Sequence, residues 1–127
     1  MSTLARPRRH HTYAEYLAYE ADSGMKHEYD AGDIVAMAGG SLRHNQLAAA
    51  VTAALYNRRS SECRVFQSDQ RIRITATGKS TYPDVSMVCG AIELDPADPS
   101  GATITNPTVI VEVLSPSTEQ DDRGSKW

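Results

Sequence analysis

The sequence predicts an α/β (α+β) fold in which helices flank a β-sheet, and three patterns support this prediction. In residues 42–59, apolar side chains recur at every fourth position among alanines, which is typical of a helix packed closely on a sheet. Residues 71–74 alternate arginine and isoleucine, as expected of a strand with one apolar face. Residues 108–114 form an apolar run interrupted by Glu112, which predicts a central strand buried on both faces.

The composition is that of one soluble globular domain. The chain has 127 residues, of which 40% are hydrophobic and 23% charged, so collagen, coiled coil and wholesale disorder are excluded. No apolar run approaches the roughly 20 residues that a membrane span needs, and no apolar stretch follows the basic N-terminal residues as in a signal peptide. Cys63 and Cys89 are too few for a disulfide framework or, without other ligands, for a zinc site. We therefore expect a cytoplasmic protein without membrane contact.

Local signals divide the first half of the chain. Residues 1–11 have no periodicity and predict a flexible basic arm, which leaves residues 12–127 as a single domain. Thr12 and Glu15 have the spacing of a capping box at the start of a helix, and Ser41 is placed to cap the long helix. The predicted elements of this half are a helix over 14–21, strands over 26–30 and 33–37, and a helix over 42–59.

The second half of the chain predicts strands separated by a turn and a long loop. Glycine, proline and aspartate are concentrated in residues 90–107, which predicts a surface loop. The predicted elements, in order, are strands over 64–67, 70–75 and 84–89 with a turn over 76–80, the loop over 90–107, a strand over 108–114 and a helix that starts at about Glu119.

Two carboxylates stand where burial is costly. Glu112 interrupts an apolar strand, and a lone buried carboxylate must be paired, protonated or bound to a metal ion. The alternative is an edge position or a strand end at the mouth of a cleft, where Glu112 is solvated. Asp84 follows Pro83 at the start of a strand, which is also a common place for a turn aspartate. If the two strands are neighbours, both carboxylates converge at one end of the sheet and offer hard oxygen ligands to Mg²⁺ or Mn²⁺.

Several segments, in this order, resemble those of a known family. They are His27–Ile34, Met37–Ser41, His44-Asn45, Phe66–Asp69, Tyr82–Val85, Ile110–Thr118 and Asp122–Lys126. With these segments the chain resembles the Uma-type restriction endonuclease family of the PD-(D/E)XK nuclease superfamily over residues 12–127. The resemblance implies a restriction-endonuclease-like core of a helix, three strands, a helix and a strand around a mixed β-sheet.

The resemblance also implies catalytic roles. Asp84 and Glu112 match the two acidic members of the motif, which bind the metal ion and take part in catalysis. The lysine usually found two positions after the second acidic residue is replaced by Leu114. In this family the lysine lies in the following helix, where Lys126 matches it. Lys126 would orient the attacking water and steady the phosphate charge.

Further residues match family positions or carry suitable charge. The resemblance implies that Glu28 completes the metal shell and that His44 is an accessory contact to metal or phosphate. The structural alternatives are a strand-face ion pair for Glu28 and a capping or surface contact for His44. Arg43, Arg71 and Arg73 are candidate contacts to DNA phosphates, although alternating arginines on a strand also fit a solvated face.

We therefore expect an endodeoxyribonuclease that uses Mg²⁺ or Mn²⁺ to hydrolyse phosphodiester bonds in DNA. Residues 1–79 carry 11 Lys and Arg against 8 Asp and Glu, whereas residues 80–127 carry 2 against 8. This asymmetry fits an enzyme acting on a polyanion as well as it fits chance.

Family domains continue beyond Lys126, so we expect a domain that is incomplete at its C-terminus and lacks the last core strand. This expectation leaves two alternatives to an active enzyme. One is a catalytically incomplete remnant of the nuclease fold that retains only metal binding or weak DNA binding. The other is an interaction module that forms a homodimer through an exposed sheet edge.

Overall fold

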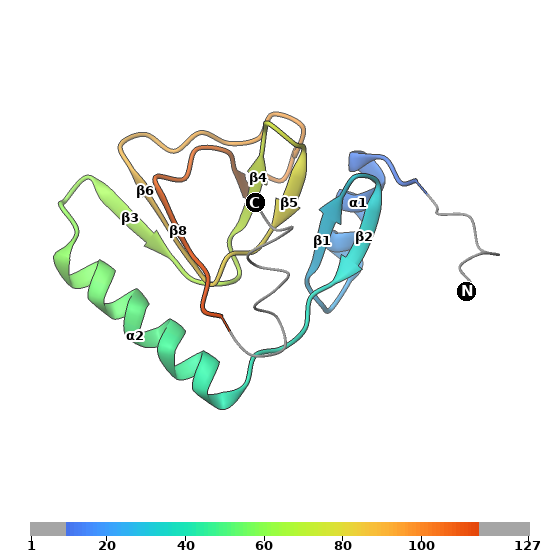
Figure 1. Cartoon of the computed structure of the whole chain (residues 1–127). Coiled ribbons are helices and arrows are strands. Elements are labelled where there is room, and N and C mark those ends of the chain that lie inside the picture. Colours follow the sequence, from blue (N-terminus) through green and yellow to red (C-terminus); the bar gives the residue numbers. More distant parts are fainter. Residues whose placement is uncertain (1–9, 115–127) are drawn as a thin grey trace.

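A computed structural model describes residues 10–114, which form two helices and eight strands (Figure 1). The predicted last helix and Lys126 lie outside the described residues, as does most of the basic arm. The elements are α1 (Tyr13–Asp22), β1 (His27–Asp30), β2 (Asp33–Ala36), α2 (Leu42–Arg58), β3 (Cys63–Phe66), β4 (Arg71–Ile74), β5 (Lys79–Thr81), β6 (Val85–Cys89), β7 (Thr103–Ile104) and β8 (Val109–Val111).

The strands form two sheets that are joined where β5 runs on into β6. The larger sheet has the order β2-β1-β5-β4-β7, in which β4 and β7 are parallel and the other neighbours antiparallel. The smaller sheet, β3-β6-β8, is antiparallel. Helix α2 packs on β3 and β6, and α1 packs on β1 (Figure 1). This mixed α+β architecture confirms the predicted fold class.

The predicted helix starts are confirmed by their capping contacts. The Thr12 hydroxyl accepts a hydrogen bond from the Glu15 amide at 3.1 Å, and the Glu15 carboxylate accepts one from the Thr12 amide at 2.7 Å. This capping box satisfies two amides that the first turn of α1 leaves unpaired. At α2, the Ser41 hydroxyl accepts a hydrogen bond from the His44 amide at 3.1 Å. Neither helix in the described part of the chain is long and apolar enough to cross a membrane.

A small apolar core joins the two sheets. Ile72 on β4, Val88 on β6 and Ile104 on β7 are 0–3% exposed and touch one another. Full burial of such a side chain contributes about 1.5–3 kcal/mol to stability. The partly buried side chains packed against this cluster are Phe66, Ile92 and Ile110. Because members come from both sheets, the core fixes the position of β6 and β8 relative to the larger sheet.

Two strands lie where the sequence predicted a turn or a loop. Residues 79–81 form β5 between β1 and β4, and the turn is confined to residues 75–78. Ser80 and Thr81 on β5 are fully buried, and their hydroxyls bond to Tyr13 and Glu28. Such a polar strand has no apolar alternation by which to predict it. Strand β7 lies inside the predicted surface loop and has only two residues.

The prediction of a central, doubly buried strand around Glu112 is wrong. Strand β8 covers only Val109–Val111, its residues are half-exposed, and within residues 10–114 it pairs with β6 alone. Glu112 therefore follows the end of the strand. It is half-buried, and its Oε2 is shielded from solvent. The apolar run reflects the β-branched residues of β8, whose one partner strand within residues 10–114 is β6.

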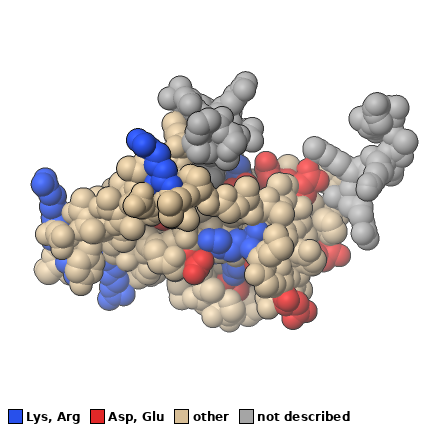
Figure 2. Space-filling model, turned by 90° about the horizontal axis from the view of Figure 1, so that it is seen from below, with Lys and Arg blue, Asp and Glu red and all other residues tan. Residues whose placement is uncertain are grey.

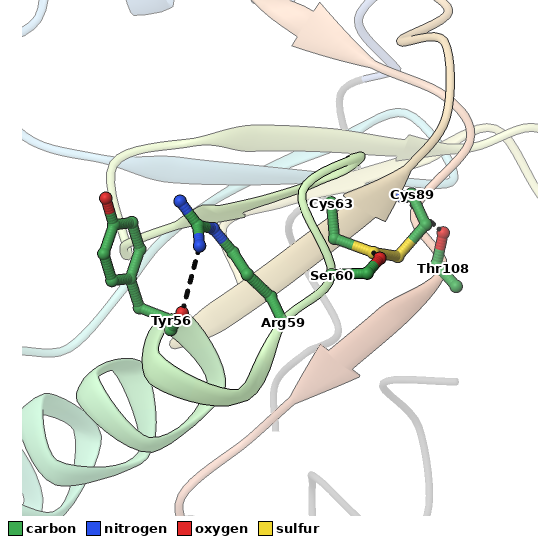
Figure 3. Close-up of a disulfide and its surroundings, with 6 residues drawn as sticks. All are labelled: Tyr56, Arg59, Ser60, Cys63, Cys89 and Thr108. Carbon is green, nitrogen blue, oxygen red and sulfur yellow. Dashed lines mark hydrogen bonds between the residues drawn. A yellow bond between two sulfur atoms is a disulfide. The ribbon is translucent and has the colours of Figure 1, made fainter.

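The two cysteines form a bond that their number did not lead us to expect. Cys63 on β3 and Cys89 on β6 stand opposite each other in the strand register and form a disulfide. Figure 3 shows this disulfide beside the end of α2, where the Arg59 guanidinium lies 3.9 Å from the centre of the Tyr56 ring. The Cys89 amide donates a hydrogen bond to the Thr108 hydroxyl at 2.9 Å.

Candidate functional site

The strand register brings Asp84 and Glu112 to the same place. In the antiparallel pairing of β6 and β8, Val85 stands opposite Val111. Asp84 directly precedes β6 and Glu112 directly follows β8, so this register pairs the two residues if it is continued by one step. Directly opposed residues of an antiparallel pair project to the same side, with Cβ atoms about 4.5–5.5 Å apart. The strands are therefore neighbours, as the convergence of the two carboxylates requires.

A backbone amide fixes Asp84 to the segment that carries Glu112. The Val113 amide donates a hydrogen bond to Asp84 Oδ2 at 2.7 Å. The Asp84 side chain is 18% exposed, so this bond is partly protected from water. Because Val113 follows Glu112 directly, the contact extends the pairing of the two segments beyond the end of β8.

The segment before Asp84 is held by buried polar contacts. Tyr82 is 6% exposed, donates a hydrogen bond to Glu20 at 2.7 Å and accepts one from Arg71 at 3.1 Å. Pro83 is fully buried and has no amide to satisfy there. Glu20 in turn accepts a hydrogen bond from the His27 amide at 2.7 Å. Asp84 thus emerges at the solvent boundary from a rigidly anchored chain.

His44 reaches Asp84 from the first turn of α2. Its Nε2 lies 3.2 Å from Asp84 Oδ2, and each of the two side chains is 18% exposed. The first turn of a helix also has a partial positive charge from its amides, which favours a nearby carboxylate. Of the residues predicted for the site, the structure therefore brings Asp84, Glu112 and His44 to one end of β6 and β8.

Glu28 lies on β1, in the larger sheet. The register that pairs Tyr29 with Ser80 sets Glu28 opposite Thr81, whose hydroxyl donates a hydrogen bond to the Glu28 carboxylate. Thr81 precedes Asp84 by three residues. Glu28 is therefore tied to the segment that leads to Asp84.

The two arginines of β4 point into the molecule. Arg71 Nη2 lies 2.8 Å from Asp98 Oδ2, and the two side chains are 11% and 3% exposed. Burial alone lowers the pKa of Arg71, but hydrogen bonds with Tyr82 and Asp98 raise it above its ordinary value. The Arg73 guanidinium lies 3.5 Å from the centre of the Tyr13 ring. These contacts favour a structural role, whereas Arg43, the other predicted phosphate contact, is exposed on α2.

Sequence reasoning missed the two carboxylates that pair with these arginines, Asp98 with Arg71 and Asp95 with Arg73, whose Nη1 lies 3.6 Å from Asp95 Oδ2. Asp95 and Asp98 are 5% and 6% exposed, although they lie in the predicted surface loop. Each accepts a hydrogen bond from the amide two residues further on, that of Ala97 at 2.9 Å and that of Ser100 at 3.0 Å. Aspartate in a proline-rich loop predicts such turns, but the ion pairs to β4 leave no local signal.

The described residues offer a metal ion two carboxylates rather than a complete cage. Within residues 10–114, no group of three or more His, Cys, Asp or Glu side chains is placed to hold an ion. Mg²⁺ usually retains several waters and binds through one or two carboxylates together with substrate phosphates. The pair formed by Asp84 and Glu112 fits this mode of binding.

Comparisons with known proteins identify a family model and two relatives that resemble this chain. A model of the Uma2 family, described as "Putative restriction endonuclease", matches residues 13–127. The uncharacterized protein slr1290 of Synechocystis sp. is 43% identical over 115 residues, which cover 89% of this chain and 58% of the relative. The uncharacterized protein sll1609 of the same organism is 35% identical over 117 residues, covering 91% and 65%.

A solved structure shares the fold. It is described as a "putative nuclease belonging to DUF820" from Anabaena variabilis, and it matches 84% of this chain with a TM-score of 0.60 and 19% identity. The match covers 62% of that protein. The chain thus spans about three fifths of the length of each relative that it matches.

Proposed function

This chain belongs to the Uma2 family described as "Putative restriction endonuclease", and we propose that it is an endonuclease that uses Mg²⁺ or Mn²⁺ to hydrolyse phosphodiester bonds in DNA. One observation supports this proposal above the others: the register of β6 and β8, continued one step past Val85 and Val111, pairs Asp84 with Glu112. Two carboxylates that converge at a solvent boundary offer the hard oxygen ligands that Mg²⁺ and Mn²⁺ prefer.

In this proposal Asp84 and Glu112 hold the ion together with water and substrate phosphate. Glu28, which forms no three-ligand group with them, instead holds the Thr81 segment from β1. When bound, the ion supplies an activated water and positive charge beside the phosphate. The buried contacts of Tyr82 and the Val113 amide keep the Asp84 carboxylate in place before substrate binds, which limits the reorganisation that the reaction requires. Lys126 orients the water and stabilises the charge on the phosphate.

The charge distribution supports DNA as the substrate. Residues 38–61, which include all of α2, contain three arginines and no Asp or Glu. Figure 2 shows the molecule from below; on the face seen there, Lys and Arg side chains stand out at the α2 end, and Asp and Glu side chains toward the β1–β2 end. Arg43 is exposed and adjoins His44 in the chain, so it is the arginine best suited to contact phosphate beside the site.

A plasmid-nicking assay tests the proposal. Supercoiled DNA is incubated with Mn²⁺ or Mg²⁺ and either the unsubstituted chain, Asp84→Asn, Glu112→Gln or the control Glu93→Gln, in which an exposed carboxylate is changed. We expect nicking by the unsubstituted chain and the control, loss of nicking in EDTA, and at least a hundredfold loss in the other two variants. Nicking by Asp84→Asn at the unsubstituted rate would contradict the proposal.

One observation favours a weaker activity as the second candidate. Because the described residues offer no cluster of three ligands, the site fits an ion held loosely, as in a nuclease-fold protein that binds metal or DNA without cleaving. Mn²⁺ binding that depends on Asp84, together with no nicking under any condition, would support this candidate over the enzyme.

A further inference from the structure

Two donors from different parts of the chain meet at one oxygen of Asp84. The Val113 amide lies 2.7 Å from Oδ2 and His44 Nε2 lies 3.2 Å from the same atom. A carboxylate only accepts hydrogen bonds, so Nε2 carries the proton that it donates. These two bonds occupy the acceptor positions of Oδ2. The other oxygen, Oδ1, has no hydrogen-bond partner among residues 10–114.

His44 is itself held in one place by the chain around it. Its amide donates to the Ser41 hydroxyl, and its ring rests against Gly40. A Cβ added at Gly40 would lie 2.5 Å from His44 Nδ1 and 2.8 Å from Asn45 Oδ1, closer than packed atoms approach. Nδ1 is buried and has no hydrogen-bond partner in the described part of the chain, so packing alone holds that side of the ring.

The neighbouring glycine lacks this constraint. A Cβ added at Gly39 would meet nothing within 4 Å. Both glycines are exposed, and neither has the positive φ that would itself require glycine. An alanine at position 40 therefore displaces the His44 ring, whereas an alanine at position 39 changes only the backbone preference.

We propose that His44, seated against Gly40, is a positioning residue that fixes the Asp84 carboxylate through Oδ2 and so presents Oδ1 as the metal-binding oxygen. The proposal rests on the metal-dependent function proposed above. Without His44 the carboxylate retains one donor, the Val113 amide, and rotates more freely about its side-chain bonds. Partners that orient a metal ligand typically account for 10–100-fold in affinity.

Two readouts test this proposal on the full chain, one of which needs no metal. Hydrogen exchange of the Val113 amide, measured by NMR, reports how firmly Asp84 Oδ2 is held. Mn²⁺ affinity, measured by titration calorimetry, reports whether Oδ1 is presented. We compare Gly40→Ala with Gly39→Ala, and His44→Ala with His44→Gln, since the glutamine amide reaches about as far as Nε2 and also donates.

We expect Gly40→Ala and His44→Ala to speed Val113 exchange several-fold and to weaken Mn²⁺ binding about 10–100-fold. Gly39→Ala stays within twofold of the unsubstituted chain, and His44→Gln recovers most of the loss. Circular dichroism identifies any variant that fails to fold. If Gly40→Ala does not fold, the comparison of His44→Ala with His44→Gln tests the proposal.

The failure of this inference and the failure of the proposed function give different results. Unchanged Val113 exchange and Mn²⁺ affinity in both Gly40→Ala and His44→Ala would overturn the positioning role while leaving the metal site intact. If the unsubstituted chain binds no Mn²⁺, the proposed function falls, and with it the role of His44 in presenting Oδ1. Equal effects at Gly39 and Gly40 would show a backbone effect and would also overturn the inference.

Discussion

Replacing Asp98 by asparagine removes one charge from the buried ion pair with Arg71. Asp98 accepts four hydrogen bonds: two from Ser100, one from Thr103 and one from Arg71, at 2.7–3.0 Å. Asparagine retains one oxygen for two of these donors but turns an NH₂ group toward the other two. The guanidinium of Arg71, whose side chain is 11% exposed, then loses its counter-charge.

The expected cost is about 3–5 kcal/mol of unfolding free energy, because breaking one side of a buried pair leaves an uncompensated charge. The matched control is Asp69→Asn. Asp69 pairs with Lys26 at 3.2 Å, but its side chain is 73% exposed, so that loss is about 0–1 kcal/mol. Urea unfolding at pH 7 measures both values. A loss for Asp98→Asn no larger than that for Asp69→Asn would refute the reasoning.

The same pair predicts a dependence on pH. Burial on its own raises the pKa of the Asp98 carboxyl, but the hydrogen bonds from Thr103, Ser100 and Arg71 outweigh it and hold that pKa well below its usual range. A depressed folded pKa contributes stability that is present above the unfolded value, about 3.9, and is lost as pH falls toward the folded value. The unsubstituted chain should therefore lose stability below about pH 4, and Asp98→Asn should lose less.

Three further predictions concern stability. Thr12→Ala removes the capping box of α1 and should cost about 1 kcal/mol in thermal unfolding, and no change in melting temperature would contradict the role of the cap. Ile72 is 0% exposed, so Ile72→Ala should lower the unfolding free energy by about 2–5 kcal/mol and Ile72→Val by about 0.5–1.5 kcal/mol, as measured by urea unfolding. Equal losses in the two variants would argue against tight packing around this side chain. Reducing the Cys63–Cys89 disulfide, whose cysteines are 26 positions apart in the sequence, should lower the unfolding free energy by about 3.5 kcal/mol. Cys63→Ser has no disulfide to reduce and serves as the control, because its stability should not change when reductant is added.

Local signals were sufficient to predict the helices and the hairpin. The capping box at Thr12 and the N-cap at Ser41 depend only on side chains within three residues, so the sequence contains all the information needed. The turn between β1 and β2 likewise depends on two central residues, both of which have positive φ. The other predicted strands begin and end within one residue of their predicted bounds, except that β8 ends three residues earlier than predicted.

The features that could not be predicted depend on contacts between distant segments. Ser80 and Thr81 form a buried strand because Tyr13 and Glu28 satisfy their hydroxyls, and neither partner is near in sequence. Arg71 binds Asp98 across 27 positions, which turns an expected solvated or DNA-binding face into an internal one. The contact between His44 and Asp84 spans 40 positions and likewise has no local signal.

The sequence predicted that Glu112 lies near Asp84, but it also predicted a central strand around Glu112 that the structure does not have. The apolar run indicated a buried central strand, but Glu112 follows the end of β8, which among the described residues pairs with β6 alone. Its convergence with Asp84 arises from the register of β6 and β8, and the sequence suggested this only under the condition that the strands are neighbours. Register is set by the whole sheet, which a single sequence does not reveal.

Binding of Mn²⁺ to four forms of the chain tests most directly whether Asp84 and Glu112 hold one ion. The forms are the unsubstituted chain, Asp84→Asn, Glu112→Gln and the double variant, with Glu93→Gln as control. We predict one ion per chain, at least a tenfold loss of affinity in each single variant and a non-additive loss in the double variant, because both side chains bind the same ion. Affinity equal to that of the unsubstituted chain in either single variant would contradict the account.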